Sequence, residues 1–250
     1  IKSAQVFEYL KHAEDYGLKV KEYDKDFDAV VNRSRTVADT MSKGVQFLLK
    51  KNKIDVIMGY GSLLPGKKIH VKAEDGSEQE LSAQNIIIAT GARSRELLSL
   101  PQDGKKVIGY RKAMTLEKQP KKLIVVGSGA IGVEFAYFYN AMGTEVTLIE
   151  YLPRIVPVED EEISKQMERS FKKSGIKVMT SAEVTSVDTS GKGVKATVKT
   201  KKGEEVVEAD VVLSAVGIKT NIENIGLETV GIATDRDKIL VNDFYQTNIP

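Results

Sequence analysis

An apolar run followed by a glycine loop and a helix is the most regular pattern in the chain. Residues 123–126 are all apolar and lead directly into a glycine-rich loop at 127–132. A short apolar run that ends in glycine is typical of a buried strand. Residues 133–142 are compatible with a helix, and a second apolar run, 146–149, stops at the acid Glu150. The pattern predicts a strand–helix–strand unit of parallel sheet.

The same order of elements occurs twice along the chain. In each half, a helix leads into an apolar strand, an antiparallel hairpin and a last buried strand. In the first half we expect these elements at residues 27–51, 54–58, around 69–71 with a turn at 75–76, and 86–89. In the second half we expect them at 161–174, 176–179, 184–187 and 194–198 with a turn at 202–203, and 211–215. Only the second half contains its own opening strand and glycine loop, so the symmetry predicts an equivalent strand, loop and helix upstream of Ile1.

The doubled order predicts an α/β fold of two Rossmann-like, three-layer domains, each with a small antiparallel meander. We expect the first domain to be incomplete and to comprise residues 1–111, with a return of the chain at 240–250. The second domain is expected at 112–239. Because the chain opens with Ile1 inside a helix-compatible pattern, we expect it to be a fragment of a longer protein.

The spacing of the glycines predicts a dinucleotide site. Gly127 allows a tight turn, Gly129 removes a side chain that would block a pyrophosphate, and Gly132 lets the helix approach the sheet. The helix N-terminus then presents free N–H groups to the phosphates. Glu150 lies near the spacing of roughly 20 residues expected for a carboxylate that binds the adenosine ribose. Since this charge repels a 2′-phosphate, the pattern favours NAD over NADP. A glycine-rich turn without a ligand is the alternative.

The composition excludes several classes of protein. The chain of 250 residues is 41% hydrophobic and 29% charged, which is ordinary for a globular protein, and its net charge of +2 implies no strong field for nucleic acid. No apolar run approaches the roughly 20 residues of a membrane span. We therefore expect no nucleic-acid or membrane partner and a cytoplasmic location. The absence of cysteine excludes thiol chemistry by this chain itself.

Several motifs resemble those of the flavin-dependent pyridine-nucleotide disulfide oxidoreductases, and the resemblance covers essentially all 250 residues. They are Gly59-Tyr60-Gly61, Ile88-Ala89-Thr90-Gly91-Ala92, the loop at 127–134, and the segments 150–161, 221–228 and 244–250. Within the family, the chain is most similar to the dihydrolipoamide dehydrogenases, a component of 2-oxoacid dehydrogenase complexes. It departs from the pattern at Ala92, where serine is commoner, and at 218–220, where many members have arginines and a proline.

The resemblance implies an enzyme that passes electrons from a dithiol through a redox-active disulfide and FAD to NAD. It implies dihydrolipoyl groups of 2-oxoacid dehydrogenase complexes as partners, and a homodimer. In the family, the flavin loop and redox cysteines precede the helix that residues 1–16 resemble, and the dimerisation domain with a catalytic histidine and glutamate lies beyond the last residue matched. We therefore expect no catalytic residue in this chain and no activity from it alone. The two histidines, His12 and His70, have no partner at metal-ligand spacing, so we also expect no metal ligand.

The resemblance also assigns cofactor-binding residues. Those expected to bind NAD are Gly127, Ser128, Gly129, Ala130, Ile131, Gly132, Val133, Glu134, Glu150, Val184 and Gly217. Those expected to line FAD are Gly61, Thr90, Gly91 and Ala92. Glu134 could instead be a plain solvated carboxylate of its helix.

Two alternatives to this function stay open. A related flavoprotein, such as an NADH oxidase, a mercuric reductase or a soluble transhydrogenase, would share this portion of the chain. A cysteine pair spaced by four residues upstream would distinguish disulfide chemistry from the others. The second alternative is a non-catalytic dinucleotide-binding module.

Overall fold

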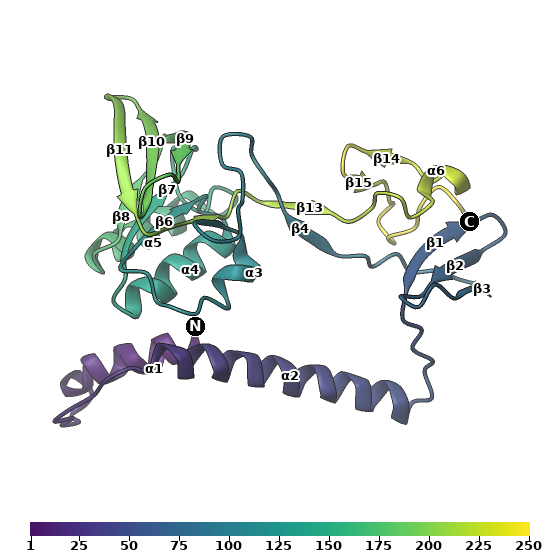
Figure 1. The fold of residues 1–250 in the computed structure, drawn as a ribbon, viewed down its shortest axis with the longest axis horizontal. Coiled ribbons are helices and arrows are strands. Elements are labelled where there is room, and N and C mark those ends of the chain that lie inside the picture. Colours follow the sequence, from purple (N-terminus) through teal and green to yellow (C-terminus); the bar gives the residue numbers. More distant parts are fainter. The chain divides into compact units, whose positions relative to one another are not determined.

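The computed structural model describes all residues 1–250, which form two compact units (Figure 1). Unit 1 contains Ile1–Asp39 and Ser94–Gly217, and unit 2 contains Thr40–Arg93 and Ile218–Pro250. None of the helices combines the length and the apolar content that a membrane span requires. The expected boundary between residues 111 and 112 separates a flavin-binding part from an NAD-binding part. It is defined by the cofactor that each part would bind, and it stays a prediction.

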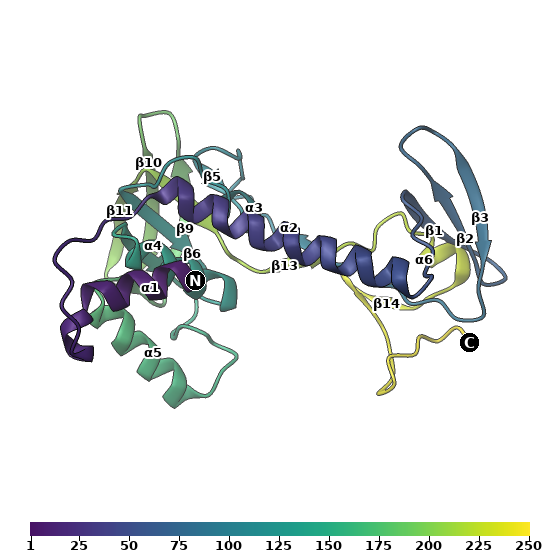
Figure 2. The same ribbon diagram turned by 90° about the horizontal axis from the view of Figure 1, so that it is seen from below.

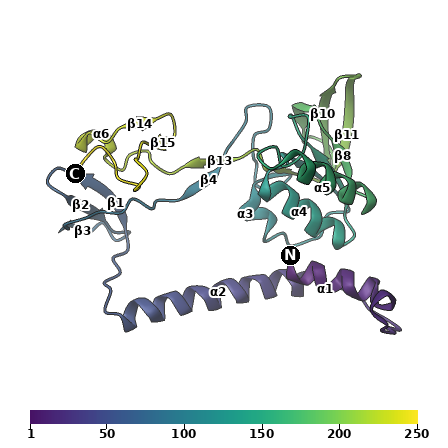
Figure 3. The same cartoon turned by 180° about the vertical axis from the view of Figure 1, so that it is seen from behind.

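Unit 1 has three layers (Figures 1 and 3). Its middle layer is a five-stranded parallel sheet, in the order β5 (Val107–Ile108), β12 (Val211–Ser214), β6 (Lys122–Val126), β7 (Glu145–Ile149) and β8 (Lys177–Met179). One face is covered by the helices α3 (Tyr110–Ala113), α4 (Ala130–Ala141) and α5 (Glu161–Lys173). The other is covered by the antiparallel strands β9 (Glu183–Asp188), β10 (Val194–Thr200) and β11 (Gly203–Ala209). The predicted Rossmann-like fold with a meander is confirmed here.

The continuous apolar runs follow from burial on both faces of this sheet. In β6, Leu123 and Val125 point into the core under the helices, whereas Ile124 and Val126 point into the core under the meander. Successive side chains of a strand alternate between faces, so a strand covered on both sides must be apolar throughout. The two cores hold β6 in place from both sides, and the glycine loop begins directly after its last residue, Val126.

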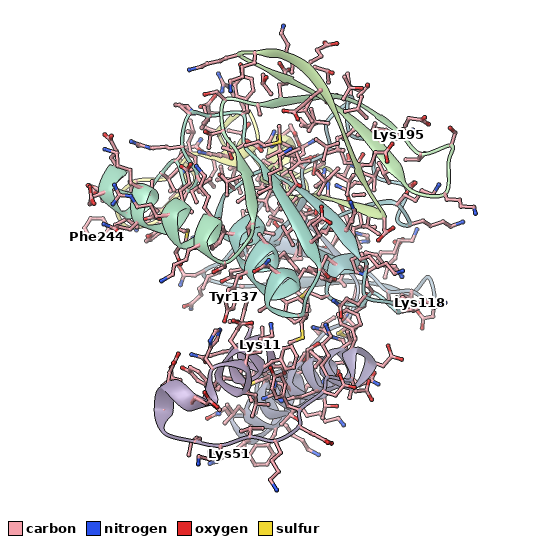
Figure 4. The ribbon with its side chains drawn as sticks, turned by 90° about the vertical axis from the view of Figure 1, so that its left-hand side faces the viewer. Lys11, Lys51, Lys118, Tyr137, Lys195 and Phe244 are labelled. Atoms are coloured by element: carbon pink, nitrogen blue, oxygen red, sulfur yellow. The ribbon has the colours of Figure 1, made fainter.

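The N-terminal helices complete the helical layer of unit 1. They are α1 (Lys2–Lys11), the 3-10 turn η1 (Ala13–Tyr16) and the beginning of α2 (Phe27–Lys51). Ala4 of α1 is fully buried against Ala141 and Met142, and Figure 2 shows α1 beside α4. Lys11 lies on the side of α1 that faces Tyr137 of α4 (Figure 4), and its ammonium donates to the carbonyl oxygen of Ala141 at 2.7 Å.

Unit 2 is built from small antiparallel sheets. Its strands are β1 (Tyr60–Leu64), β2 (Lys68–Lys72) and β3 (Glu78–Ser82), then β13 (Ile218–Thr220) with β4 (Ala92–Ser94), whose last residue belongs to unit 1, and β14 (Thr234–Asp235) with β15 (Lys238–Ile239). The short helix α6 (Leu227–Val230) packs on β1. A Cβ on Gly226, which precedes α6, would lie 2.4 Å from the carbonyl oxygen of Leu63, so glycine permits this close contact. The core is small, with Val71, Ile225 and Leu227 as its buried side chains.

Two strands expected in the first half are not formed. Residues 54–58 and 86–89 run without strand pairing, and Met58 and Ile87 are largely exposed. A strand needs a neighbour to satisfy its N–H and C=O groups, and the equivalent strands of unit 1, β8 and β12, flank β7 and β6. Unit 2 has no counterpart of β6 and β7 within residues 1–250. The first domain is therefore incomplete in this chain, as expected.

The buried hydroxyl of Tyr139 gives a test of the core. It donates to the carbonyl oxygen of Ala113 at 2.6 Å, and burial raises the pKa of Tyr139. Tyr139→Phe leaves that buried carbonyl without its donor, so we expect the free energy of unfolding in urea to fall by about 1–3 kcal/mol. Tyr137→Phe, on the same helix, removes a hydroxyl that makes no hydrogen bond and should cost under about 0.5 kcal/mol. Equal losses in the two variants would contradict the assignment.

Candidate functional site

The glycine loop connects the end of β6 to the start of α4. Gly127 has a φ of 96°, and a Cβ on it would lie 2.4 Å from the carbonyl oxygen of Ala215. A Cβ on Gly132 would lie 1.9 Å from the carbonyl oxygen of Gly127. Both contacts are with backbone atoms, which cannot move aside as a flexible side chain can. These two glycines are therefore required by the fold itself.

Gly129 is different, because nothing in the protein requires its missing side chain. Its φ of −68° and ψ of −176° suit any residue, and no atom lies within 4 Å of the position that a Cβ would take. Gly129 is the N-cap of α4, and no side chain caps this helix. The first N–H groups of α4 therefore have no acceptor within the helix. Open space in front of free donors, at the positive end of a helix, suits a phosphate group.

Glu150 lies at the tip of β7, next to the glycine loop, and only 7% of it is exposed. Its Oε2 accepts hydrogen bonds from the N–H of Ser128 at 2.8 Å and from the hydroxyl of Ser128 at 2.6 Å. Its Oε1 accepts one from the N–H of Leu152 at 2.8 Å. A carboxylate offers about four acceptor positions, so these bonds leave one on Oε1. The buried charge is stabilised by three donors and keeps capacity for one more.

The other residues expected to bind NAD lie around the same edge of the sheet in unit 1. The N–H of Ala182 donates to the carbonyl oxygen of Glu150, which places the start of β9 beside β7. Val184 of β9 points into the core under the meander, so only its backbone can face a ligand. Gly217 follows β12, has a φ of 106° and is exposed.

The expected residues of α4 itself divide by burial. Val133 packs in the core, Ile131 is half-buried and Ala130 is exposed. Glu134 is exposed and forms no hydrogen bond or salt bridge within residues 1–250. Both interpretations of Glu134, a cofactor contact and a solvated carboxylate, therefore stay open.

The residues expected to line FAD lie in unit 2. Thr90 and Gly91 lie in the loop that leads into Ala92, the first residue of β4. Asn221 holds this loop, because its side-chain amide donates to the carbonyl oxygen of Thr90 at 3.1 Å and its N–H donates to that of Gly91 at 3.0 Å. Gly61 lies in β1, opposite Val71, and no hydrogen bond joins it to this loop. Three of the four residues are thus neighbours in the sequence, and the structure does not link the fourth to them by a hydrogen bond.

Sequence reasoning missed the charged group that fixes this loop. Arg93 donates to the side-chain oxygen of Asn221 at 2.8 Å and to Glu223 at 2.7 Å. Hydrogen bonds from the guanidinium of Arg93 and, to a smaller extent, from the ammonium of Lys219 hold the pKa of Glu223 well below its usual range. The segments that contain Arg93 and Glu223 are far apart in the sequence, and no local pattern signals that they pair.

Sequence reasoning also missed the contact between Ser128 and Glu150. The N–H and the hydroxyl of Ser128 both donate to the carboxylate of Glu150.

Comparison with known proteins gives one consistent family. The chain matches the family described as pyridine nucleotide-disulphide oxidoreductase over residues 4–250. The dihydrolipoyl dehydrogenase of Zymomonas mobilis is 41% identical over 250 residues, which are 100% of this chain and 54% of that protein. The dihydrolipoyl dehydrogenase of Rhizobium etli is 42% identical over 265 residues, covering 100% of this chain and 55% of that protein.

A solved structure agrees with the sequence comparisons. The crystal structure of LpdA from Mycobacterium tuberculosis superposes with a TM-score of 0.87 at 31% identity, covering 97% of this chain and 52% of that chain. The chain thus spans about half the length of the relatives it matches. The family match, by contrast, covers nearly all of this chain, and it confirms the resemblance that the glycine loop and the flavin-side motifs indicate. The chain belongs to the pyridine nucleotide-disulphide oxidoreductase family.

Proposed function

We propose that the chain is the middle portion of a dihydrolipoyl dehydrogenase and that it supplies the NAD site and part of the flavin site. The observation that carries this proposal is the open space at Gly129, which lies in front of an uncapped helix and next to the carboxylate of Glu150. The names of the similar proteins from Zymomonas mobilis and Rhizobium etli support the substrate class. The whole enzyme would oxidise dihydrolipoyl groups of 2-oxoacid dehydrogenase complexes as a homodimer.

The residues of unit 1 fit NAD. The free N–H groups at the start of α4 would hold the pyrophosphate, and Gly129 leaves the room it needs. The free acceptor position of Glu150 would receive a ribose hydroxyl, and its negative charge would repel a 2′-phosphate. Bound NAD supplies a hydride acceptor, whereas the chain contributes binding and orientation.

The residues of unit 2 fit only part of FAD. Thr90 and Gly91 offer a fixed loop that leads into Ala92, but within residues 1–250 unit 2 has no strand–glycine loop–long helix unit like that at 122–141. The apolar side chains of Ile54, Val56, Ile57 and Met58 are exposed, so this segment has no core to pack against within residues 1–250. In the whole enzyme, the Thr90 loop and Gly61 would line the flavin, and the pyrophosphate of FAD would be bound by other residues.

Coenzyme preference tests the role of Glu150. We expect calorimetric titration of the 250-residue chain to show tighter binding of NADH than of NADPH, because the carboxylate accepts from a ribose hydroxyl and repels a phosphate. Glu150→Ala should remove most of this preference. Glu145→Ala is the control, since Glu145 is exposed at the opposite end of the same strand. Equal affinities of the unchanged chain for both coenzymes would overturn the assignment.

The glycines separate a binding role from a folding role. Gly129→Ala places a methyl group in the open space, so we expect the free energy of unfolding to change by less than about 1 kcal/mol while the affinity for NADH falls at least about tenfold. Gly132→Ala drives a methyl group into the carbonyl of Gly127 and should destabilise the chain by more than about 3 kcal/mol. Urea unfolding and NADH titration measure the two effects. Unchanged NADH binding by Gly129→Ala would show that the pyrophosphate does not lie there.

A further inference from the structure

Ser128 connects the glycine loop to the acid that would select the coenzyme. Its side chain is fully buried, and its hydroxyl and N–H both donate to the same oxygen of Glu150. Because its N–H is directed at a carboxylate of the protein, Ser128 has no donor left for a phosphate. Its contacts therefore point to a role exerted through Glu150 and not through the pyrophosphate.

The carbonyl group of Ser128 makes a second connection, to the loop that follows β7. It accepts a hydrogen bond from the N–H of Val156 at 3.0 Å. Val156 is buried and has a φ of 39°, a conformation that is rare for a β-branched residue. Such a conformation persists only where the surroundings hold it in place. Ser128 thus holds both ends of the segment 150–156, and this segment carries the acid.

The bonds to Glu150 determine which of its oxygens can face a ligand. With both donors of Ser128 on Oε2 and the N–H of Leu152 on Oε1, the carboxylate cannot rotate without losing several bonds at once. Hydrogen bonds to a charged group are about twice as strong as neutral ones, so the orientation is held firmly. Without the hydroxyl, Oε2 would keep a single donor and the carboxylate could turn towards solvent.

We propose that Ser128 is a positioning residue whose hydroxyl sets the preference for NADH over NADPH by fixing the carboxylate of Glu150. The inference rests on the proposed function, because it presupposes a dinucleotide at this loop. The added claim is that two residues, Ser128 and Glu150, together select the coenzyme.

The test is a double-mutant cycle read as the ratio of the two affinities. Calorimetry gives the Kd values for NADH and NADPH of the 250-residue chain and of the variants Ser128→Ala, Glu150→Gln and the two combined. We expect Ser128→Ala to reduce the preference about tenfold, the size of one lost hydrogen bond to a charge. In the Glu150→Gln background, the same change should leave the ratio unaltered. Ser128→Gly also lacks the hydroxyl and gives the same readout if the alanine variant does not fold.

Ser164→Ala is the matched control. Ser164 is also a buried serine, and its hydroxyl donates to the carbonyl oxygens of Val156 and Asp160 without touching Glu150. It should leave the coenzyme ratio unchanged even where it lowers the melting temperature.

The outcomes separate the inference from the proposed function. Affinities for NADH and NADPH that fall by the same factor in Ser128→Ala would show a purely structural role and overturn the inference alone. Absence of binding of either coenzyme to the unchanged chain would overturn the proposed function and, with it, this inference.

Discussion

The close approach of α4 to the end of β6 is the constraint on which the site depends. It is possible only because Gly132 carries no Cβ, since such an atom would lie 1.9 Å from the carbonyl oxygen of Gly127, and Gly127 in turn lies against the carbonyl of Ala215 at the end of β12. This contact aims the start of α4 across the sheet edge, beside the tip of β7. The free N–H groups and the buried carboxylate of Glu150 therefore share one edge of unit 1. A small change in the angle of the helix would separate them.

Much of unit 1 could be predicted from the sequence because its signals are local. The apolar run of β6, the glycine spacing and the acid after β7 lie within thirty residues, and each states a requirement of the strand–helix–strand unit. The partners of Glu150 could not be predicted in the same way. A serine between two glycines is compatible with a phosphate contact, and only the fold shows that its donors turn to the neighbouring strand.

Unit 2 shows why a correct apolar pattern does not suffice to form a strand. The residues at 54–58 and 86–89 have the composition of buried strands, but their pairing partners are not among residues 1–250. Strand formation is a property of the neighbours as much as of the segment, whereas the helix at Phe27–Lys51 satisfies its own backbone and forms as predicted. The Arg93–Glu223 ion pair could not be predicted either, because it joins segments that are distant in the sequence and depends on how they pair in the fold.

The contact of Lys11 with the last turn of α4 has a consequence for the ligand-free protein. The ammonium group sits against the carbonyl of Ala141, where the helix carries its partial negative charge. Lys11 also pairs with Glu8 at 2.6 Å, so this contact contributes modestly to the last turn of α4, at the end opposite to the uncapped N–H groups. If the proposed function holds, the donors that would receive the pyrophosphate are already aligned before the nucleotide binds, so little conformational entropy would be lost on binding.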